Sequence, residues 1–154
     1  MKLHLGTLKL ESPDFLHGQP LPIACSADGA GRAPRLSWND PQEPVNSFVL
    51  IGQDPDAPLT NGFDHWVVYN IPGTVRALDG ESATRYTVGL NGLGEPGWCP
   101  ASPPPGHGTH FYYFHLYGLD AELHLPSGLT PADLMARIDE HIVEQARIVG
   151  TYER

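Results

Sequence analysis

Frequent glycine and proline residues limit what this chain can fold into more than any other feature of its sequence. The 154 residues include 17 glycines and 16 prolines, about a fifth of the chain, whereas an average protein has roughly 12%. Both residue types destabilise a helix interior, and proline also removes a hydrogen bond from a central strand. The apolar runs between them are short, which predicts a mainly β fold and argues against a helical bundle.

Short apolar runs bounded by glycine and proline are the strand candidates. The segment Phe48–Ile51 is continuously apolar, so we expect a strand buried on both faces. The predicted strands are Leu3–Leu10, Arg35–Trp38, Ser47–Gln53, His65–Ile71, Tyr86–Val88 and Thr109–Leu119.

One helix is predicted near the end of the chain. Thr130 is suited to the N-cap and Pro131 to the first helical position, and Asp133 places an acid in the first turn. The apolar stripe that follows consists of Leu134, Ile138, Ile142 and Val149. This spacing predicts a helix that packs on the sheet and ends near Gly150.

The charge balance excludes two classes of partner. Asp and Glu number 18 against 9 Lys and Arg, which gives a net charge of −9 with histidine neutral. Nucleic acids and anionic membrane surfaces both attract basic patches, so neither is an expected partner. Uninterrupted apolar stretches of about 18 residues are lacking in the sequence, so we expect no membrane span.

Length and cysteine content suggest an ordinary intracellular domain. A chain of this size can bury enough surface to fold without disulfides or metals, and we expect one domain over residues 1–154. The first residues lack the apolar region of a signal peptide, which predicts a cytoplasmic location. Cys25 and Cys99 are therefore expected to be free thiols.

An acidic turn, Asp54-Pro55-Asp56-Ala57-Pro58, follows the predicted buried strand. In one interpretation the aspartates only cap backbone amides of the turn. In another they form a phosphatase-type Asp-x-Asp site. Pro58 stands where that site requires Thr or Val, and the chain lacks alternating strands and helices, so the phosphatase interpretation is rejected.

Two further segments carry histidines on predicted strands. In the first, alternation places His65, Val67 and Tyr69 on one face, and Trp66, Val68 and Asn70 on the other. A histidine in such a strand is more often a core residue than a ligand.

The second segment, Pro103–Phe114, is a stiff proline-rich loop followed by a strand on which His110, Tyr112 and Phe114 share a face. Histidine and tyrosine side by side can donate hydrogen bonds to an oxyanion.

Metal and cofactor sites find little support in the sequence. His65, His107, His110, Asp54 and Asp56 could converge, but their spacing matches no metal signature. The segment Gly92–Gly97 fits Gly-x-Gly-x-x-Gly, but Trp98-Cys99-Pro100 cannot open a helix, so dinucleotide binding is rejected. We therefore expect neither a metal nor a cofactor.

Taken together, these segments resemble the phosphatidylethanolamine-binding protein family, in its bacterial and archaeal Raf-kinase-inhibitor-like branch. The resemblance covers nearly the whole chain, from Ser12-Pro13 to Gly150-Thr151-Tyr152. Its most specific parts are the acidic turn at Asp54–Pro58 and the Pro103–Gly108 segment before His110. The family usually has Arg where this chain has Phe111, and its animal members extend beyond the position of Arg154.

The resemblance implies a β-sandwich with a C-terminal helix and a small pocket for anionic groups at one end. Carried over by position, Asp54, His65, His110 and Tyr112 line this pocket, and an aspartate there can hold an imidazole in one tautomer. The residues expected to shape its rim are Asp56, Ala57, Pro58, Phe63, Ser102, Pro103 and Pro104.

The leading hypothesis is a non-enzymatic binding or regulatory protein for a phosphate- or carboxylate-bearing ligand, which could modulate a kinase or protease. The alternative is a hydrolase in which Asp54 or His110 acts as general base, with or without a metal. A third hypothesis is a protein-interaction module that uses the loop Pro100–Gly108. The sequence does not fix the oligomeric state, and a homodimer is one option.

Overall fold

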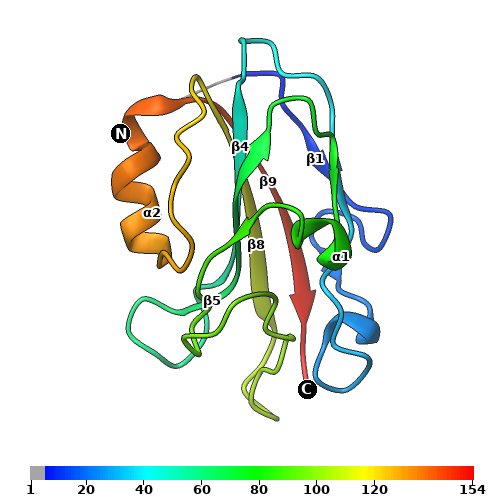
Figure 1. Ribbon diagram of the computed structural model, residues 1–154. Coiled ribbons are helices and arrows are strands. Elements are labelled where there is room, and N and C mark those ends of the chain that lie inside the picture. Colours follow the sequence, from blue (N-terminus) through cyan, green and yellow to red (C-terminus); the bar gives the residue numbers. More distant parts are fainter. Residues whose placement is uncertain (1–5) are drawn as a thin grey trace.

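Two β-sheets form the body of the molecule, as Figure 1 shows for the computed structural model, which describes residues 6–154. The larger sheet runs in the order β2 (Gln19–Pro20), β9 (Ile142–Tyr152), β8 (His110–Leu119), β4 (Ser47–Asp54), β5 (Phe63–Pro72), β7 (Thr87–Val88). The smaller sheet has the order β1 (Leu10–Glu11), β3 (Leu36–Trp38), β6 (Ala77–Leu78). Among these pairs only β2–β9 is parallel. The fold is therefore mainly β, as predicted.

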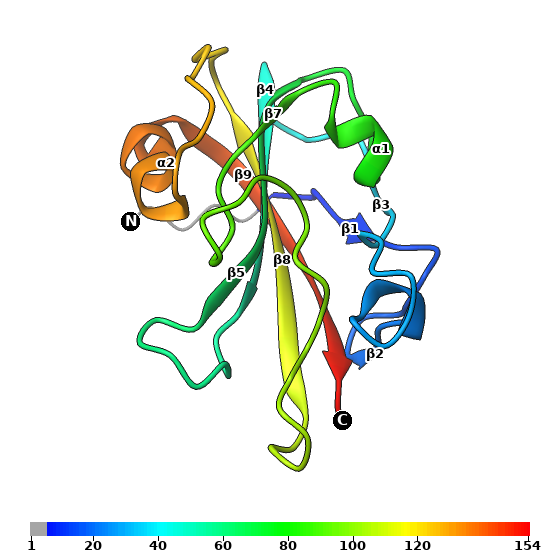
Figure 2. The same cartoon turned by 60° about the horizontal axis from the view of Figure 1, so that its bottom comes forward.

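Helical elements are short and lie at the periphery of the sheets (Figure 2). They are α1 (Gly80–Ala83), α2 (Pro131–Ile138) and two 3₁₀ turns, Ile23–Cys25 and Asp139–His141. Thr130 accepts a hydrogen bond from the amide of Asp133 and Pro131 opens the helix, so the predicted start of α2 is confirmed. Along the described part of the chain, no helix is both long and apolar enough to cross a membrane.

Two apolar cores use opposite faces of the large sheet. Phe48 and Leu50 belong to the core shared with the small sheet, whereas Val49 and Ile51 belong to the core under α2. All four side chains are buried, which confirms the prediction of a strand covered on both faces. Burying several large apolar side chains per strand, at about 1.5–3 kcal/mol each, makes β4 the central support of the fold.

The sequence predicted a helix that is too long. The observed helix α2 ends at Ile138, and Ile142–Tyr152 forms the strand β9 instead. This strand pairs antiparallel with β8, from His110↔Tyr152 to Leu119↔Ile142. The apolar spacing that resembled a helical stripe also fits a strand, since Ile148 faces the first core while Ile142 faces the second. Tertiary context decides the outcome, because β9 satisfies the backbone hydrogen bonds along one edge of β8.

The first predicted strand is also wrong in extent. Leu3–Leu5 lie outside the described residues, and the strand β1 covers only Leu10–Glu11. Thr7 and Leu8 instead donate backbone hydrogen bonds to the buried carboxylate of Glu144 on β9. A side-chain acceptor therefore replaces strand pairing for this segment.

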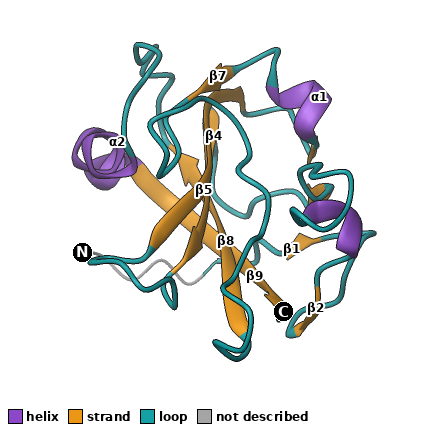
Figure 3. Ribbon diagram, turned by 90° about the horizontal axis from the view of Figure 1, so that it is seen from below, coloured by secondary structure: helices purple, strands orange, loops and turns teal. Residues whose placement is uncertain are grey.

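Loops gather where β4 ends and where β5 and β8 begin, at the lower end of the large sheet in Figure 1. Seen from below in Figure 3, the 55–62 loop and the long segment 89–109 lie around the open ends of these strands. The chain also ends here, since Tyr152 pairs with His110. The fold thus brings residues from four distant segments to one end of the sheet.

Candidate functional site

A cavity of about 420 Å³ opens at this end of the large sheet, and we call it the end cavity. It is lined by Asp54, Ala57, Pro58, Leu59, Phe63, His65, Leu93, Cys99, Pro100, Ser102, Pro103, Pro104, His110 and Tyr112. The structure therefore brings together all the residues expected at the site except Asp56. The cavity lining also includes four residues that the sequence reasoning did not place at the site, namely Leu59, Leu93, Cys99 and Pro100.

The acidic turn follows β4 and contacts the start of β8 through its two aspartates. Asp54 is buried at the end of β4, where its Oδ1 accepts the amide of Asp56 at 2.8 Å and its Oδ2 lies 2.7 Å from Nδ1 of His110. Asp56 lies outside the lining and accepts the amide of Phe111 at 2.9 Å. Asp54 thus caps an amide of its own turn, as the first interpretation predicts, and it also orients the ring of His110, whereas Asp56 caps an amide of β8.

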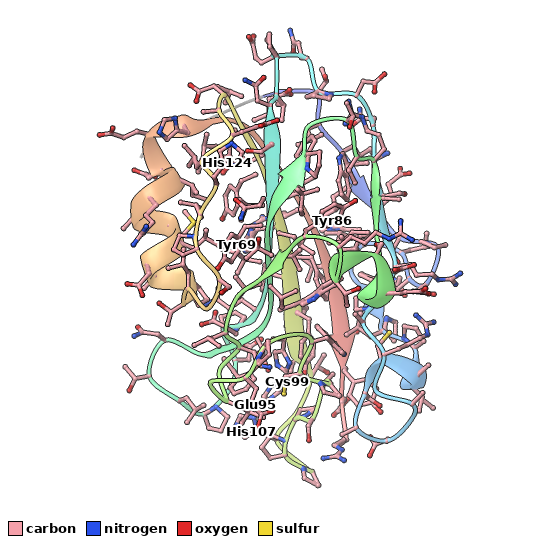
Figure 4. All side chains as sticks on the ribbon, in the orientation of Figure 1. Tyr69, Tyr86, Glu95, Cys99, His107 and His124 are labelled. Atoms are coloured by element: carbon pink, nitrogen blue, oxygen red, sulfur yellow. The ribbon has the colours of Figure 1, made fainter. Side chains whose placement is uncertain are left out.

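His110 uses both of its ring nitrogens within the protein. Its Nδ1 faces Asp54, and its Nε2 lies 2.6 Å from Nδ1 of His107. His110 is buried, whereas His107 is exposed on a loop where Gly106 and Gly108 have φ of +76° and +91°. In Figure 4, His107 is labelled at the lower end of the molecule, below Cys99 and Glu95. The sequence placed His107 near the site but gave no sign of this contact.

His65 lies on the other side of the strand from the predicted one. Val67 and Tyr69 face the core under α2, as expected, but the ring of His65 packs against Tyr112, with 5.1 Å between centroids. Gly52 pairs with Trp66 and Gln53 with Asp64, so His65 is the extra residue of a β-bulge. A bulge shifts the alternation of side chains by one residue, which turns His65 into the end cavity.

Burial and one backbone contact set the protonation of His65. Its Nδ1 lies 2.6 Å from the carbonyl oxygen of Cys99 and must donate to it, since a carbonyl only accepts. The neutral ring therefore presents an unprotonated Nε2. Burial lowers the pKa of His65, although the Cys99 carbonyl and the charge of Asp54 act in the opposite direction.

Tyr112 contributes a hydroxyl that the described chain leaves unpaired. The side chain is 1% exposed and lines the end cavity, and its hydroxyl has no hydrogen-bond partner among residues 6–154. Burial raises the pKa of Tyr112, and the carboxylate of Asp54 raises it further, so the hydroxyl stays protonated. A buried O–H without a partner is a ready donor for a ligand oxygen.

Loop residues and the C-terminal segment form the outer wall. Ser102 and Pro104 are exposed rim residues, and Ser102 Oγ accepts a hydrogen bond of 3.1 Å from Arg154. Arg154 also pairs with Asp28, 2.6 Å between Nη2 and Oδ1. The side chain of Phe111, at the family's usual arginine position, is 41% exposed. Arg154 is therefore a cation in direct contact with this wall, and the sequence reasoning missed it.

Potential metal ligands and cysteines were compared with the arrangement that a metal site or a disulfide requires. Within residues 6–154, no group of three or more His, Cys, Asp or Glu is arranged to hold a metal ion. Cys25 and Cys99 are free thiols, in agreement with the prediction. What the end cavity offers chemically is a tyrosine donor, two histidines that can be donors or acceptors, and one oriented carboxylate.

Comparisons with known proteins agree with the resemblance to the family seen in the sequence. The family model described as "Phosphatidylethanolamine-binding protein" matches residues 11–153. A UPF0098 protein from Chlamydia trachomatis is 40% identical over 96% of this chain and 99% of its own length.

Two crystal structures are similar over 96% of this chain. One is a phosphatidylethanolamine-binding protein homologue, CT736, from Chlamydia trachomatis, with a TM-score of 0.89, 38% identity and 97% of that chain covered. The other is YbcL from E. coli, described as a member of the mammalian family, with a TM-score of 0.88, 28% identity and 98% of that chain covered.

Proposed function

The chain belongs to the phosphatidylethanolamine-binding protein family, and from this premise we propose that it is a non-enzymatic binding protein whose end cavity takes a small phosphate- or carboxylate-bearing ligand. The observation that carries the proposal is the hydroxyl of Tyr112, buried in the wall of the end cavity without a partner among residues 6–154. Leaving such a hydroxyl unpaired costs about 1–3 kcal/mol, which a ligand oxygen would recover.

The two histidines fit an anion although the molecule is acidic overall. His65 and His110 both line the end cavity, and each has one ring nitrogen committed to a protein oxygen. A protonated Nε2 on either ring would be a second donor beside Tyr112 and would add positive charge. Local donors of this kind bind a small anion through short contacts, whereas the net charge of −9 acts over longer distances and is screened by salt.

Phosphate monoesters match this set of groups in one further respect. Neutral His65 presents an acceptor at Nε2, since its Nδ1 donates to Cys99. A monoprotonated phosphate carries both a P–OH donor and several acceptor oxygens, so it can pair with His65 and Tyr112 at once. A carboxylate offers acceptors only and requires protonation of His65, so we expect it to bind more weakly at neutral pH.

Titration with inorganic phosphate, phosphoethanolamine and acetate, followed by NMR of the histidine rings, tests this function. We expect the resonances of His65 and His110 to move together in a saturable way, and those of His141, which pairs with Asp120 far from the end cavity, to stay still. Binding that persists unchanged in both His65→Ala and Tyr112→Phe, or resonances that do not move at millimolar ligand, would refute the proposal.

A hydrolase is the second candidate, and the Asp54–His110 contact of 2.7 Å is what favours it. A carboxylate that orients an imidazole is part of many general-base sites. A screen of phosphate and acyl esters with wild type and His110→Ala separates the two functions. Turnover that the substitution abolishes, or stoichiometric metal retained through mild purification, would favour the enzyme over the binding protein.

We also propose that the exposed loop can contact a protein partner, such as a kinase or protease. Pro104, Pro105 and Gly106 are exposed, and consecutive prolines keep the segment stiff, which lowers the entropy cost of association. Pull-down with wild type and with a variant lacking residues 103–106 tests this, and identical partner sets would count against the loop. A cytoplasmic location stays a prediction of the sequence, to be checked by cell fractionation.

A further inference from the structure

The Nε2 atom of His110 is occupied by another side chain of the same protein. His110 lines the end cavity with 1% of its surface exposed, and its Nδ1 is held by Asp54 at 2.7 Å. Nε2 is therefore the ring nitrogen of His110 that could bind a ligand, and this Nε2 lies 2.6 Å from Nδ1 of His107. An anion that uses His110 therefore has to replace His107.

The positions of the protons follow from the partners. The carboxylate of Asp54 accepts, so Nδ1 of His110 carries a proton, and the contact between the two rings requires one more proton shared between Nε2 and Nδ1 of His107. When both rings are neutral, this proton belongs to His107. If His110 is the imidazolium, His107 accepts instead. The contact therefore survives at most one added proton, and two imidazolium rings would repel each other.

Other charged and titratable groups lie on the elements and segments next to this pair. They are Asp54 and Asp56 at and after the end of β4, His65 on β5, Tyr112 on β8, and Glu153 and Arg154 after β9. Asp54 is the one in hydrogen-bond contact with either ring. Asp54 accepts from Nδ1 of His110 and not from His107, so it holds the ring of His110 in place while the ring of His107 is held through His110.

The segment that carries His107 is built to release it. The flanking Gly106 and Gly108 have positive φ, and a Cβ at either position would meet nothing within 4 Å. His107 itself is exposed, and its amide donates to the carbonyl of Pro104 within the same turn. Its ring can therefore swing away from His110 without disturbing the core, whereas His65 is 5% exposed and packed between Tyr112 and Trp98.

We propose that His107 is an internal competitor for the anion: its ring occupies Nε2 of His110 in the free protein and is displaced by a ligand oxygen. This rests on the proposed function and names a residue that sets the affinity of the end cavity. In the bound state His110 is an imidazolium between Asp54 and the anion. The proton that His107 and His110 share in the free protein moves to Nε2 of His110. His107 then takes a proton from solvent at its own Nε2, so its ring stays neutral.

The competition has a measurable size. A net hydrogen bond between neutral groups shifts an equilibrium by roughly 2- to 10-fold, since water competes for the same atoms. The substitution His107→Ala removes the competitor and leaves Asp54, His65, His110 and Tyr112 in place. We therefore expect it to bind inorganic phosphate about 2- to 10-fold more tightly than wild type at pH 7. Since His107 is exposed, the variant should fold, which its thermal unfolding curve verifies.

Calorimetric titration with inorganic phosphate and NMR of the histidine rings test the competitor in wild type, His107→Ala and His141→Ala. His141 is a matched control, because it is a partly exposed histidine bonded, like His107, to another side chain, here Asp120 at 2.8 Å, and it lies outside the end cavity. We expect tighter binding for His107→Ala, an unchanged constant for His141→Ala, and joint movement of the His107 and His110 resonances in wild type.

The outcomes separate the two proposals. Phosphate binding by wild type that moves His110 but is equal or weaker in His107→Ala would overturn the competitor and leave the end cavity as an anion site. Binding seen only in His107→Ala would support a competitor stronger than expected. Absence of binding in both proteins would overturn the proposed function, and the competitor with it.

Discussion

Substitution of Tyr112 by phenylalanine should stabilise the protein while it weakens ligand binding. The hydroxyl of Tyr112 is buried and has no partner in the part of the chain that the structure describes, so the folded state bears its desolvation. Removing an unsatisfied buried hydroxyl should recover about 1 kcal/mol and up to about 3 kcal/mol. For a chain of this length, each kcal/mol raises the Tm by roughly 2–4 °C. Loss of a hydrogen bond to an anion should weaken binding by roughly 10- to 100-fold.

Tyr69 supplies the matched control for this prediction. It is as buried as Tyr112, but its hydroxyl accepts the amide of Leu129 at 3.2 Å and donates to the carbonyl of Pro126. Tyr69→Phe leaves both backbone groups without their partner, so it should lower the free energy of unfolding by about 1–3 kcal/mol. Thermal and denaturant unfolding measure both variants without ligand, and calorimetry with phosphate measures binding. If Tyr112→Phe lost as much stability as Tyr69→Phe, the reasoning from the unpaired hydroxyl would be wrong.

Three further predictions concern other buried groups. Glu144→Ala should lower the free energy of unfolding by at least about 3 kcal/mol, because three backbone amides lose a buried carboxylate; a loss below 1 kcal/mol in denaturant unfolding would contradict this. Burial lowers the pKa of His65 and His115 in the folded state, whereas in the unfolded chain histidine titrates near its ordinary pKa of about 6.5. The unfolded state therefore binds more protons as the pH falls through this value, and the Tm should be lower at pH 5.5 than at pH 7.5. A Tm that is higher at pH 5.5 would contradict this reasoning. Iodoacetamide should modify half-buried Cys99 before Cys25, which is buried with its pKa raised to about 11, as peptide mass spectrometry can show; the reverse order would count against these environments.

Local patterns sufficed for the central elements of the fold. The run Phe48–Ile51 could only be buried on both faces, and β4 does separate the two cores. The N-cap Thr130 and Pro131 fixed the start of α2, because capping depends on a few adjacent residues. Order and spacing of the acidic turn and the Pro103–His110 segment pointed to the family, and the comparisons support that membership over residues 11–153.

Errors arose where two periodicities fit the same residues. Ile138 and Ile142 are spaced for a helix, but Ile142 begins β9, because β8 offers a long row of unpaired backbone groups on that edge. His65 follows strict alternation in the sequence, yet the bulge opposite Gly52 and Gln53 turns it to the other face. Neither the partner strand nor the bulge leaves a mark in the local sequence.

The sequence by itself determined the mainly β class and the burial of β4, which follow from apolar pattern and turn chemistry. Through motif order and the family resemblance it also indicated most of the residues that gather at the end cavity. Tertiary structure decided which atoms face which: the ring of His65 beside Tyr112, the unpaired hydroxyl of Tyr112, and His107 on Nε2 of His110. The physical reason is range. Backbone propensities act over a few neighbouring residues, whereas a hydrogen bond between Asp54 and His110 depends on placing groups 56 positions apart within 2.7 Å.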